Sequence, residues 1–235
     1  MFARAGTWIA CLALSLVTGC ATVQKQAYDR AAHRDVASVG LLTPHPTKEY
    51  PVVNVGHLGN SFGLIGVLVA STDRELKTKE FTTAAQARGL DVAKLYEETL
   101  KTGLEKMGYR VVVISVERPR GLFLDSYDNL APGIDIYVDS NVGAGYLAAS
   151  GTADYLPNVG TNTRVVKRAS KEIVYREIVN YGYESRIGAA VSIASDPRYR
   201  YSDFSALMSN VDDAVDALRI GVARVAERTL LDLAR

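Results

Sequence analysis

The amino terminus sets the strongest limit on how this chain folds. The first twenty residues, MFARAGTWIACLALSLVTGC, carry one positive charge at Arg4, then an apolar run from Trp8 to Val17, then small residues. This order is typical of a secretory signal peptide, and the run is shorter than the about twenty apolar residues that a transmembrane helix needs. We therefore expect residues 1–19 to be removed on secretion.

The end of this signal, LVTGC at residues 16–20, resembles the bacterial lipobox. The resemblance implies cleavage before Cys20 and a diacylglyceryl group on its thiol, so that acyl chains such as palmitate anchor a lipoprotein to the membrane. Because Ala21 rather than aspartate follows Cys20, the resemblance also implies sorting to the outer membrane. We expect a lipid-anchored protein on the periplasmic face of the outer membrane, with Cys20 as the lipidation site.

Lipidation also limits the chemistry of the mature chain. Cys11 leaves with the signal and Cys20 carries the lipid, so no free thiol remains for disulfides, nucleophilic catalysis or metal binding. The three histidines, His33, His45 and His57, lack the short helical spacing that zinc ligands prefer. We expect no metal site and no cofactor.

Length and charge indicate one globular unit. Removing 19 of the 235 residues leaves 216, enough for a single domain with a real core. Arg4 is one of the 27 basic residues, so 26 basic residues balance 26 acidic ones, which predicts no nucleic-acid partner. We divide the chain into a signal peptide (1–19), a lipidated cysteine with its tether (20–35) and a single periplasmic domain (36–235).

Hydrophobic patterning predicts the strands of this domain. Residues 36–42 read as a buried strand, and the β-branched run 110–116 reads as a central strand covered on both faces. Residues 134–140 alternate and continue through 142–149, which predicts a strand whose Asp135 and Asp139 are exposed. The runs 163–169 and 173–183, joined by a compact polar turn, predict a hairpin.

Two segments predict helices. Residues 91–107 carry apolar side chains at three- and four-residue steps, with Asp91 as the N-cap and Gly108 as the end. Residues 211–235 form a second amphipathic stripe with acids early and arginines late, the polarity that the helix dipole favours. The expected fold class is α/β, of the α+β type: a mixed sheet of about five strands packed by two long amphipathic helices.

The stretch GHLGNSFG at residues 56–63 contains G-x-S-x-G and raises the hypothesis of a hydrolase with Ser61 as nucleophile. In hydrolases with that elbow the histidine base follows the serine in the chain. All three histidines precede Ser61, so we rank a hydrolase below the non-enzymatic functions and expect no catalytic residue.

An apolar segment follows directly, from residue 62 to residue 70. Large apolar patches on soluble surfaces usually mark contacts, so we expect this segment to bury itself against a second copy or an envelope partner. Burial within the domain and insertion into lipid are the alternatives. The expected interface residues are Phe62, Leu64, Ile65, Val67 and Leu68.

The order of predicted elements behind a lipobox resembles the periplasmic α/β lipoproteins related to the curli secretion channel, the TolB amino-terminal domain and exopolysaccharide-export lipoproteins. The matching stretches are VASVGLLTP, LKTGLEKMGYRVVV, GIDIYVDS and TRVVKRASKEIVYRE. The turn of the last stretch lacks the family's Asp and Gly, so no functional residue of the family is transferred to this chain.

The resemblance implies a non-enzymatic scaffold or an assembly or export accessory component, often ring-forming, with a homo-oligomer or an envelope protein as partner. A lipid- or glycan-binding periplasmic module is the alternative function.

Overall fold

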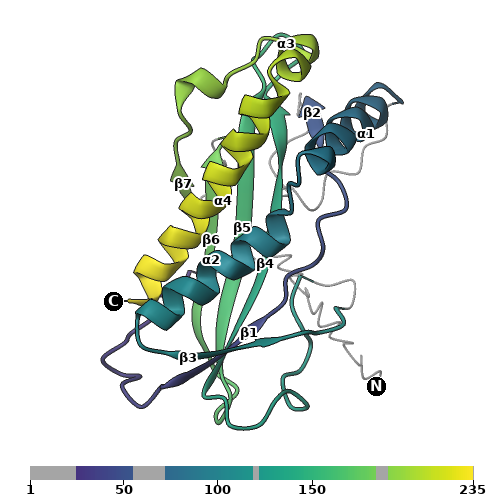
Figure 1. Cartoon of the computed structure of the whole chain (residues 1–235). Coiled ribbons are helices and arrows are strands. Elements are labelled where there is room, and N and C mark those ends of the chain that lie inside the picture. The colour runs from purple at the N-terminus through teal and green to yellow at the C-terminus, as the bar shows by residue number, and fades with distance from the viewer. Residues whose placement is uncertain (1–24, 55–71, 119–121, 184–189, 235) are drawn as a thin grey trace, which may run out of the picture.

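A mixed β-sheet forms the centre of the described part of the chain, which comprises residues 25–54, 72–118, 122–183 and 190–234 of the computed structural model (Figure 1). The strands are β1 (Ser38–Leu42), β2 (Val52–Asn54), β3 (Arg110–Ile114), β4 (Ile136–Ala148), β5 (Leu156–Lys167), β6 (Ile173–Gly182) and β7 (Ala190–Ile193). The helical elements are α1 (Thr72–Ala87), α2 (Val92–Lys106), the 3₁₀ turn η1 (Pro197–Tyr199), α3 (Phe204–Ser209) and α4 (Val211–Leu233).

The strand order is β3-β1-β4-β5-β6-β7, and β2 pairs with the far end of β4. The long strands β4, β5 and β6 are antiparallel to their neighbours in this trio, whereas β1 and β2 run parallel to β4, β3 to β1, and β7 to β6. The expected α/β class with a mixed sheet is confirmed, with seven strands in place of about five.

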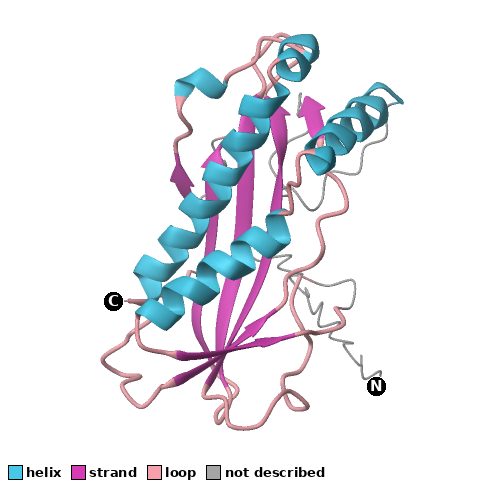
Figure 2. Ribbon diagram, in the orientation of Figure 1, coloured by secondary structure: helices cyan, strands magenta, loops and turns pink. Residues whose placement is uncertain are grey.

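Helices α2 and α4 cover one face of the sheet (Figure 2). Helix α2 begins where the sequence predicted, because the carboxylate of Asp91 accepts a hydrogen bond from the backbone N of Lys94 at 3.0 Å. The two helices approach closely at Gly103, where a Cβ atom would overlap the side chain of Leu230. Burial of the α2 stripe against the sheet stabilises the fold by about 1.5–3 kcal/mol for each large apolar side chain. These side chains are Val92, Tyr96, Leu100 and Leu104.

The prediction of a central strand at residues 110–116 is wrong, since β3 is an edge strand. Its side chains nevertheless pack on both faces: Val111 contacts the main core beneath α2, and Val112 and Ile114 join a smaller apolar cluster. Val113 remains 36% exposed at the open edge. The β-branched run therefore reflects packing on both faces and not a central position in the sheet.

Helix α1 was not expected from the sequence, because its apolar stripe is short. It buries Phe81 together with two threonines whose hydroxyls accept backbone hydrogen bonds from the segment ahead of it. Thr82 Oγ1 accepts from Tyr50 N at 2.9 Å, and Thr78 Oγ1 accepts from Val52 N at 3.2 Å. No helix in the described ranges is both long and apolar enough to cross a membrane.

Candidate functional site

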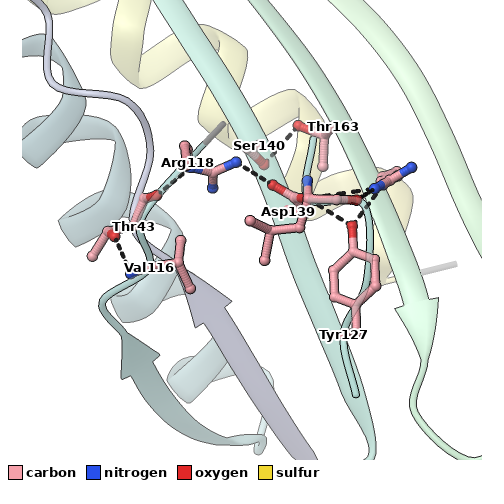
Figure 3. A network of polar contacts seen from close by, with 9 residues as sticks. Thr43, Val116, Arg118, Tyr127, Asp139, Ser140 and Thr163 are labelled. Atoms are coloured by element: carbon pink, nitrogen blue, oxygen red, sulfur yellow. Dashed lines mark hydrogen bonds and ion pairs between the residues drawn. The ribbon is translucent and has the colours of Figure 1, made fainter. Parts of the chain in front are cut away.

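One buried carboxylate organises the sheet face that α2 and α4 leave uncovered. Asp139 on β4 is 0% exposed, so the prediction that it is an exposed strand residue is wrong. Its Oδ1 accepts from Arg118 Nη1 at 2.6 Å, and its Oδ2 accepts from Tyr127 Oη at 2.6 Å and from Leu124 N at 3.0 Å (Figure 3). The segment after β3 covers this face and supplies the donors, which is why a charged residue lies inside.

Arg118 connects this carboxylate to the end of β1. Its side chain is 3% exposed, and its Nε donates to the carbonyl oxygen of Thr43 at 2.8 Å. The hydroxyl of Thr43 in turn accepts from Val116 N at 3.3 Å (Figure 3). Arg118 therefore ties the described start of the segment after β3 to both β1 and β4.

Arg164, directly opposite Asp139 on β5, completes the charge balance. Its Nη2 lies 3.8 Å from Asp139 Oδ2, and its Nε donates to Tyr127 Oη at 2.6 Å. The guanidinium also lies over the ring of Phe123, 4.4 Å from the ring centroid. Burial, together with the adjacent carboxylate of Asp139, raises the pKa of Tyr127, so the phenol remains a neutral donor.

All of these interactions hold a loop against a sheet. Asp139 is fully inaccessible, and both of its oxygens already accept hydrogen bonds from Arg118, Tyr127 and Leu124. A carboxylate that serves as a general base needs access to the proton it takes. The network therefore fits a structural role in fixing the segment between β3 and β4.

Asp135, the second aspartate of this strand pattern, is half-buried and also acts as an acceptor. Its Oδ2 accepts from Ala37 N at 3.0 Å and from the backbone N and hydroxyl of Ser38 at 2.8 Å each. Burial raises the pKa of Asp135, but these hydrogen bonds outweigh burial and lower the pKa overall. The carboxylate fixes the start of β1.

A second polar cluster lies where the amino-terminal segment reaches the sheet. Gln26 forms an antiparallel bridge with Arg176 on β6, with reciprocal backbone hydrogen bonds of 2.9 Å. The neighbouring Lys25 forms an ion pair with Glu177, with Nζ 2.6 Å from Oε1. Tyr28, two residues after Gln26, is 4% exposed. The described part of the expected tether is therefore packed on the domain from residue 25 onward.

Glu177 belongs to an acidic pair beneath the end of α4. Its side chain is 1% exposed, and Asp232 of α4 is a neighbour that receives Arg228 Nη2 at 2.8 Å and the Tyr175 hydroxyl at 3.3 Å. Burial raises the pKa of Glu177, and Asp232 adds to the increase, while Lys25 opposes it. Burial likewise raises the pKa of Tyr175. The cluster links the amino-terminal segment, the β5–β6 hairpin and α4.

Two asparagines on the sheet each carry a side-chain atom that lacks a partner within the described residues. Asn141 on β4 lies directly opposite Asn162 on β5, and Asn141 is 3% exposed. The Nδ2 of Asn141 and the Oδ1 of Asn162 are buried without a hydrogen bond. An unpaired buried polar atom is costly, and such atoms often mark a functional or water-filled site.

The residues singled out from the sequence have different outcomes. Cys20 and Ser61 lie outside the described residues, and so do the five expected interface residues Phe62, Leu64, Ile65, Val67 and Leu68. His33 is described, and its ring lies against Tyr28 with 5.3 Å between centroids.

Within the described ranges, no cluster of three or more histidine, cysteine, aspartate or glutamate side chains is arranged to hold a metal ion. A small cavity of about 140 Å³ lies beside the β5–β6 turn, between Tyr127 and Lys171. Small-molecule sites usually measure about 300–1,000 Å³, so this cavity is too small for a typical organic ligand. Both of its lysines form ion pairs, because Lys171 Nζ lies 2.6 Å from Asp128 Oδ1 and Lys167 Nζ lies 3.1 Å from Asp35 Oδ2.

Sequence reasoning missed both polar clusters. A signal for the first cluster was present in the sequence: Asp139 follows the apolar run Ile136–Val138 of the strand, and Arg118 and Arg164 lie on either side of the strand in the chain. A buried acid usually requires such partners. For the second cluster, Glu177 sits at an apolar-phase position of β6, which also favours burial.

No protein-family model matches this chain, and no curated protein sequence does so either. Among solved structures, the chain is similar to protein XCC0632 from Xanthomonas campestris, which is described with the family model DUF330. The two share 10% sequence identity with a TM-score of 0.37, and the match covers 90% of this chain and 93% of that one. It is also similar to the hypothetical protein CT253 from Chlamydia trachomatis, at 12% identity and a TM-score of 0.25, covering 80% and 99%. At these scores the likenesses carry no argument about function, and what the fold and the site define is an α/β domain with two structural polar clusters.

Proposed function

We propose that this protein is a non-enzymatic outer-membrane lipoprotein, anchored through Cys20, whose periplasmic domain acts as a scaffold or as an accessory component in assembly or export. The observation that carries the proposal is the fixed entry of the amino-terminal segment into the sheet. Gln26 pairs with Arg176 only six residues after the lipobox cysteine, so the lipid and the domain are closely coupled.

The two polar clusters also support this proposal. In each cluster, the buried carboxylates form hydrogen bonds or ion pairs with arginine, lysine, tyrosine or backbone donors of the same chain. Such arrangements rigidify a domain and fix its loops, which is what a component that presents a defined surface to partners requires.

Acyl labelling tests the anchor. Replacing Cys20 with Ser should abolish incorporation of labelled palmitate while leaving the domain folded, since the hydroxyl accepts no thioether-linked lipid. Thr18→Ser is the matched control, because it changes a neighbouring lipobox position, keeps the cysteine and should remain labelled. Persistent labelling of the Cys20→Ser protein would refute the anchor.

Partner capture tests the scaffold role. Cross-linking of the lipidated protein in whole envelopes should recover either higher oligomers or a defined envelope protein. We further propose that Phe62, Leu64, Ile65, Val67 and Leu68 form the contact. Replacing Leu64 and Val67 with Lys should then remove the cross-linked species and leave the circular dichroism spectrum unchanged. Loss of the fold would instead indicate burial within the domain.

A lipid- or glycan-binding module remains the second candidate, favoured by the unpaired amide atoms of Asn141 and Asn162. Native mass spectrometry of the protein purified from its own envelope tests it. A bound lipid or oligosaccharide that disappears in Asn141→Ala supports this candidate, and a ligand-free spectrum counts against it.

A further inference from the structure

The chain between the lipid and the sheet is short. Six residue steps separate Cys20 from Gln26, and a fully extended chain spans at most about 3.3–3.6 Å per residue, which limits the separation to about 20 Å. Gln26 is fixed by two backbone hydrogen bonds to Arg176, so this limit applies to a defined point on the surface of β6. An anchored domain must therefore keep this point within about 20 Å of the lipid head groups.

An apolar and cationic surface lies beside that point. Arg176 Cζ is 5.8 Å from the ring centroid of Phe123, and Phe123 follows Leu122, one of the few large apolar side chains of the described residues that are more than a third exposed, at 39%. We name Leu122, Phe123 and Arg176 the anchor-side patch. Exposed apolar side chains flanked by cations are the composition of surfaces that rest in a membrane interface.

The charges around the patch favour an anionic partner. Arg164 forms an ion pair with Asp139, and Lys25 forms one with Glu177. Arg176, by contrast, has no carboxylate within ion-pair distance among the described residues. A partly exposed guanidinium without an acidic partner favours phosphate, which it binds through two parallel hydrogen bonds.

We propose that the anchor-side patch contacts the phospholipid head groups of the leaflet that holds the lipid anchor, with Leu122 inserted at the head-group boundary and Arg176 bound to phosphate. This inference rests on the proposed anchoring at Cys20. It adds an orientation: the sheet face that carries the patch, which is opposite the face covered by α2 and α4, lies toward the membrane.

The chain offers a clean probe of this orientation. Its one tryptophan, Trp8, lies in the signal, so the mature protein contains none. Leu122→Trp therefore introduces a single fluorophore into the patch. Leu76→Trp is the matched control, because Leu76 is 62% exposed on α1, a helix that packs on β2 and α4.

Both lipidated variants are reconstituted into vesicles of phosphatidylethanolamine and phosphatidylglycerol, with bromine atoms near the head-group end of the acyl chains. Interfacial side chains lie about 5–10 Å into the boundary, so Trp fluorescence at position 122 should be quenched at least about twofold more than at position 76. Adding Arg176→Gln to Leu122→Trp should reduce the quenching and its dependence on phosphatidylglycerol.

The outcomes separate this inference from the function on which it rests. The first outcome is equal quenching at both positions in protein that carries the acyl mass and floats with the vesicles. This result overturns the orientation but leaves the anchor intact. Protein that lacks the acyl mass on Cys20 overturns both. Strong quenching at position 76 alone would show the opposite orientation and also refute the proposal.

Discussion

Replacing Asp139 with Asn tests whether the buried network holds the uncovered face of the sheet. The substitution keeps the shape of the side chain but removes the charge that balances Arg118, which is 3% exposed. Breaking a buried ion pair by removing one partner costs about 3–5 kcal/mol, because the remaining charge stays uncompensated. The hydrogen bond from Tyr127 to the carboxylate is also weakened, since charge-assisted bonds are about twice as strong as neutral ones.

We therefore expect the free energy of unfolding of Asp139→Asn to fall by about 3–5 kcal/mol, measured by urea denaturation followed by circular dichroism. Asp128→Asn is the control, because Asp128 lies in the same connection between β3 and β4 but forms an exposed pair with Lys171. Exposed pairs contribute little, so this variant should unfold close to the wild type.

The double variant distinguishes a buried charge from a general packing defect. In a background of Arg118→Met, the Asp139→Asn change should cost less than it does alone, because no uncompensated guanidinium is left at that position. Hydrogen exchange should show the same pattern, with faster exchange at Leu124 and its neighbours in Asp139→Asn. An Asp139→Asn protein within about 1 kcal/mol of the wild type would refute the reasoning.

Three further predictions concern other parts of the molecule. Because the pKa of Glu177 is raised in the folded protein, the native state binds a proton more tightly than the unfolded chain does. The free energy of unfolding should therefore fall as pH rises above about 4.5. Glu177→Gln should lose this part of the pH dependence in urea titrations. Gly103→Val should destabilise the contact with Leu230 by about 1–3 kcal/mol, while Thr102→Val on the exposed face of α2 should not, as thermal or urea unfolding will show. Ser61 should remain unlabelled by fluorophosphonate probes, and labelling that Ser61→Ala abolishes would revive the hydrolase hypothesis.

The parts of the fold that depend on local signals could be predicted from the sequence. The N-cap at Asp91, the turn between β5 and β6, and the stripe of α4 are set by residues close together in the chain, and each forms where it was expected, although β5 begins at Leu156 and not at residue 163. Local hydrogen bonds and helical or alternating periodicity are sufficient for such elements.

The polar clusters depend on partners that are distant in the chain, which a periodicity argument does not see. Alternation along β4 indicated only that Asp139 lies on the face opposite its apolar neighbours, and the usual inference from that is solvent exposure. The segment carrying Arg118 and Tyr127 covers this face instead, so the polar side of the strand is an interior surface. The same covering layer gives β3 its apolar residues on both faces although it is an edge strand.

Under the proposed anchoring at Cys20, the coupling between the lipid and the core would determine how the domain reaches a partner. A long Gly/Ser tether would let the domain rotate freely, but here the chain is held at Gln26 and Lys25, and Glu177 joins this entry point to Asp232 at the end of α4. Helix α4 has 23 residues, so it extends for about 35 Å along the sheet from that end. Under the proposed anchoring, the entry point stays within about 20 Å of the head groups and the far end of α4 lies about 35 Å from it, so partners of the domain must meet it within this bounded layer. A scaffold that positions other envelope components needs such a bounded distance, whereas a freely diffusing binding module would not.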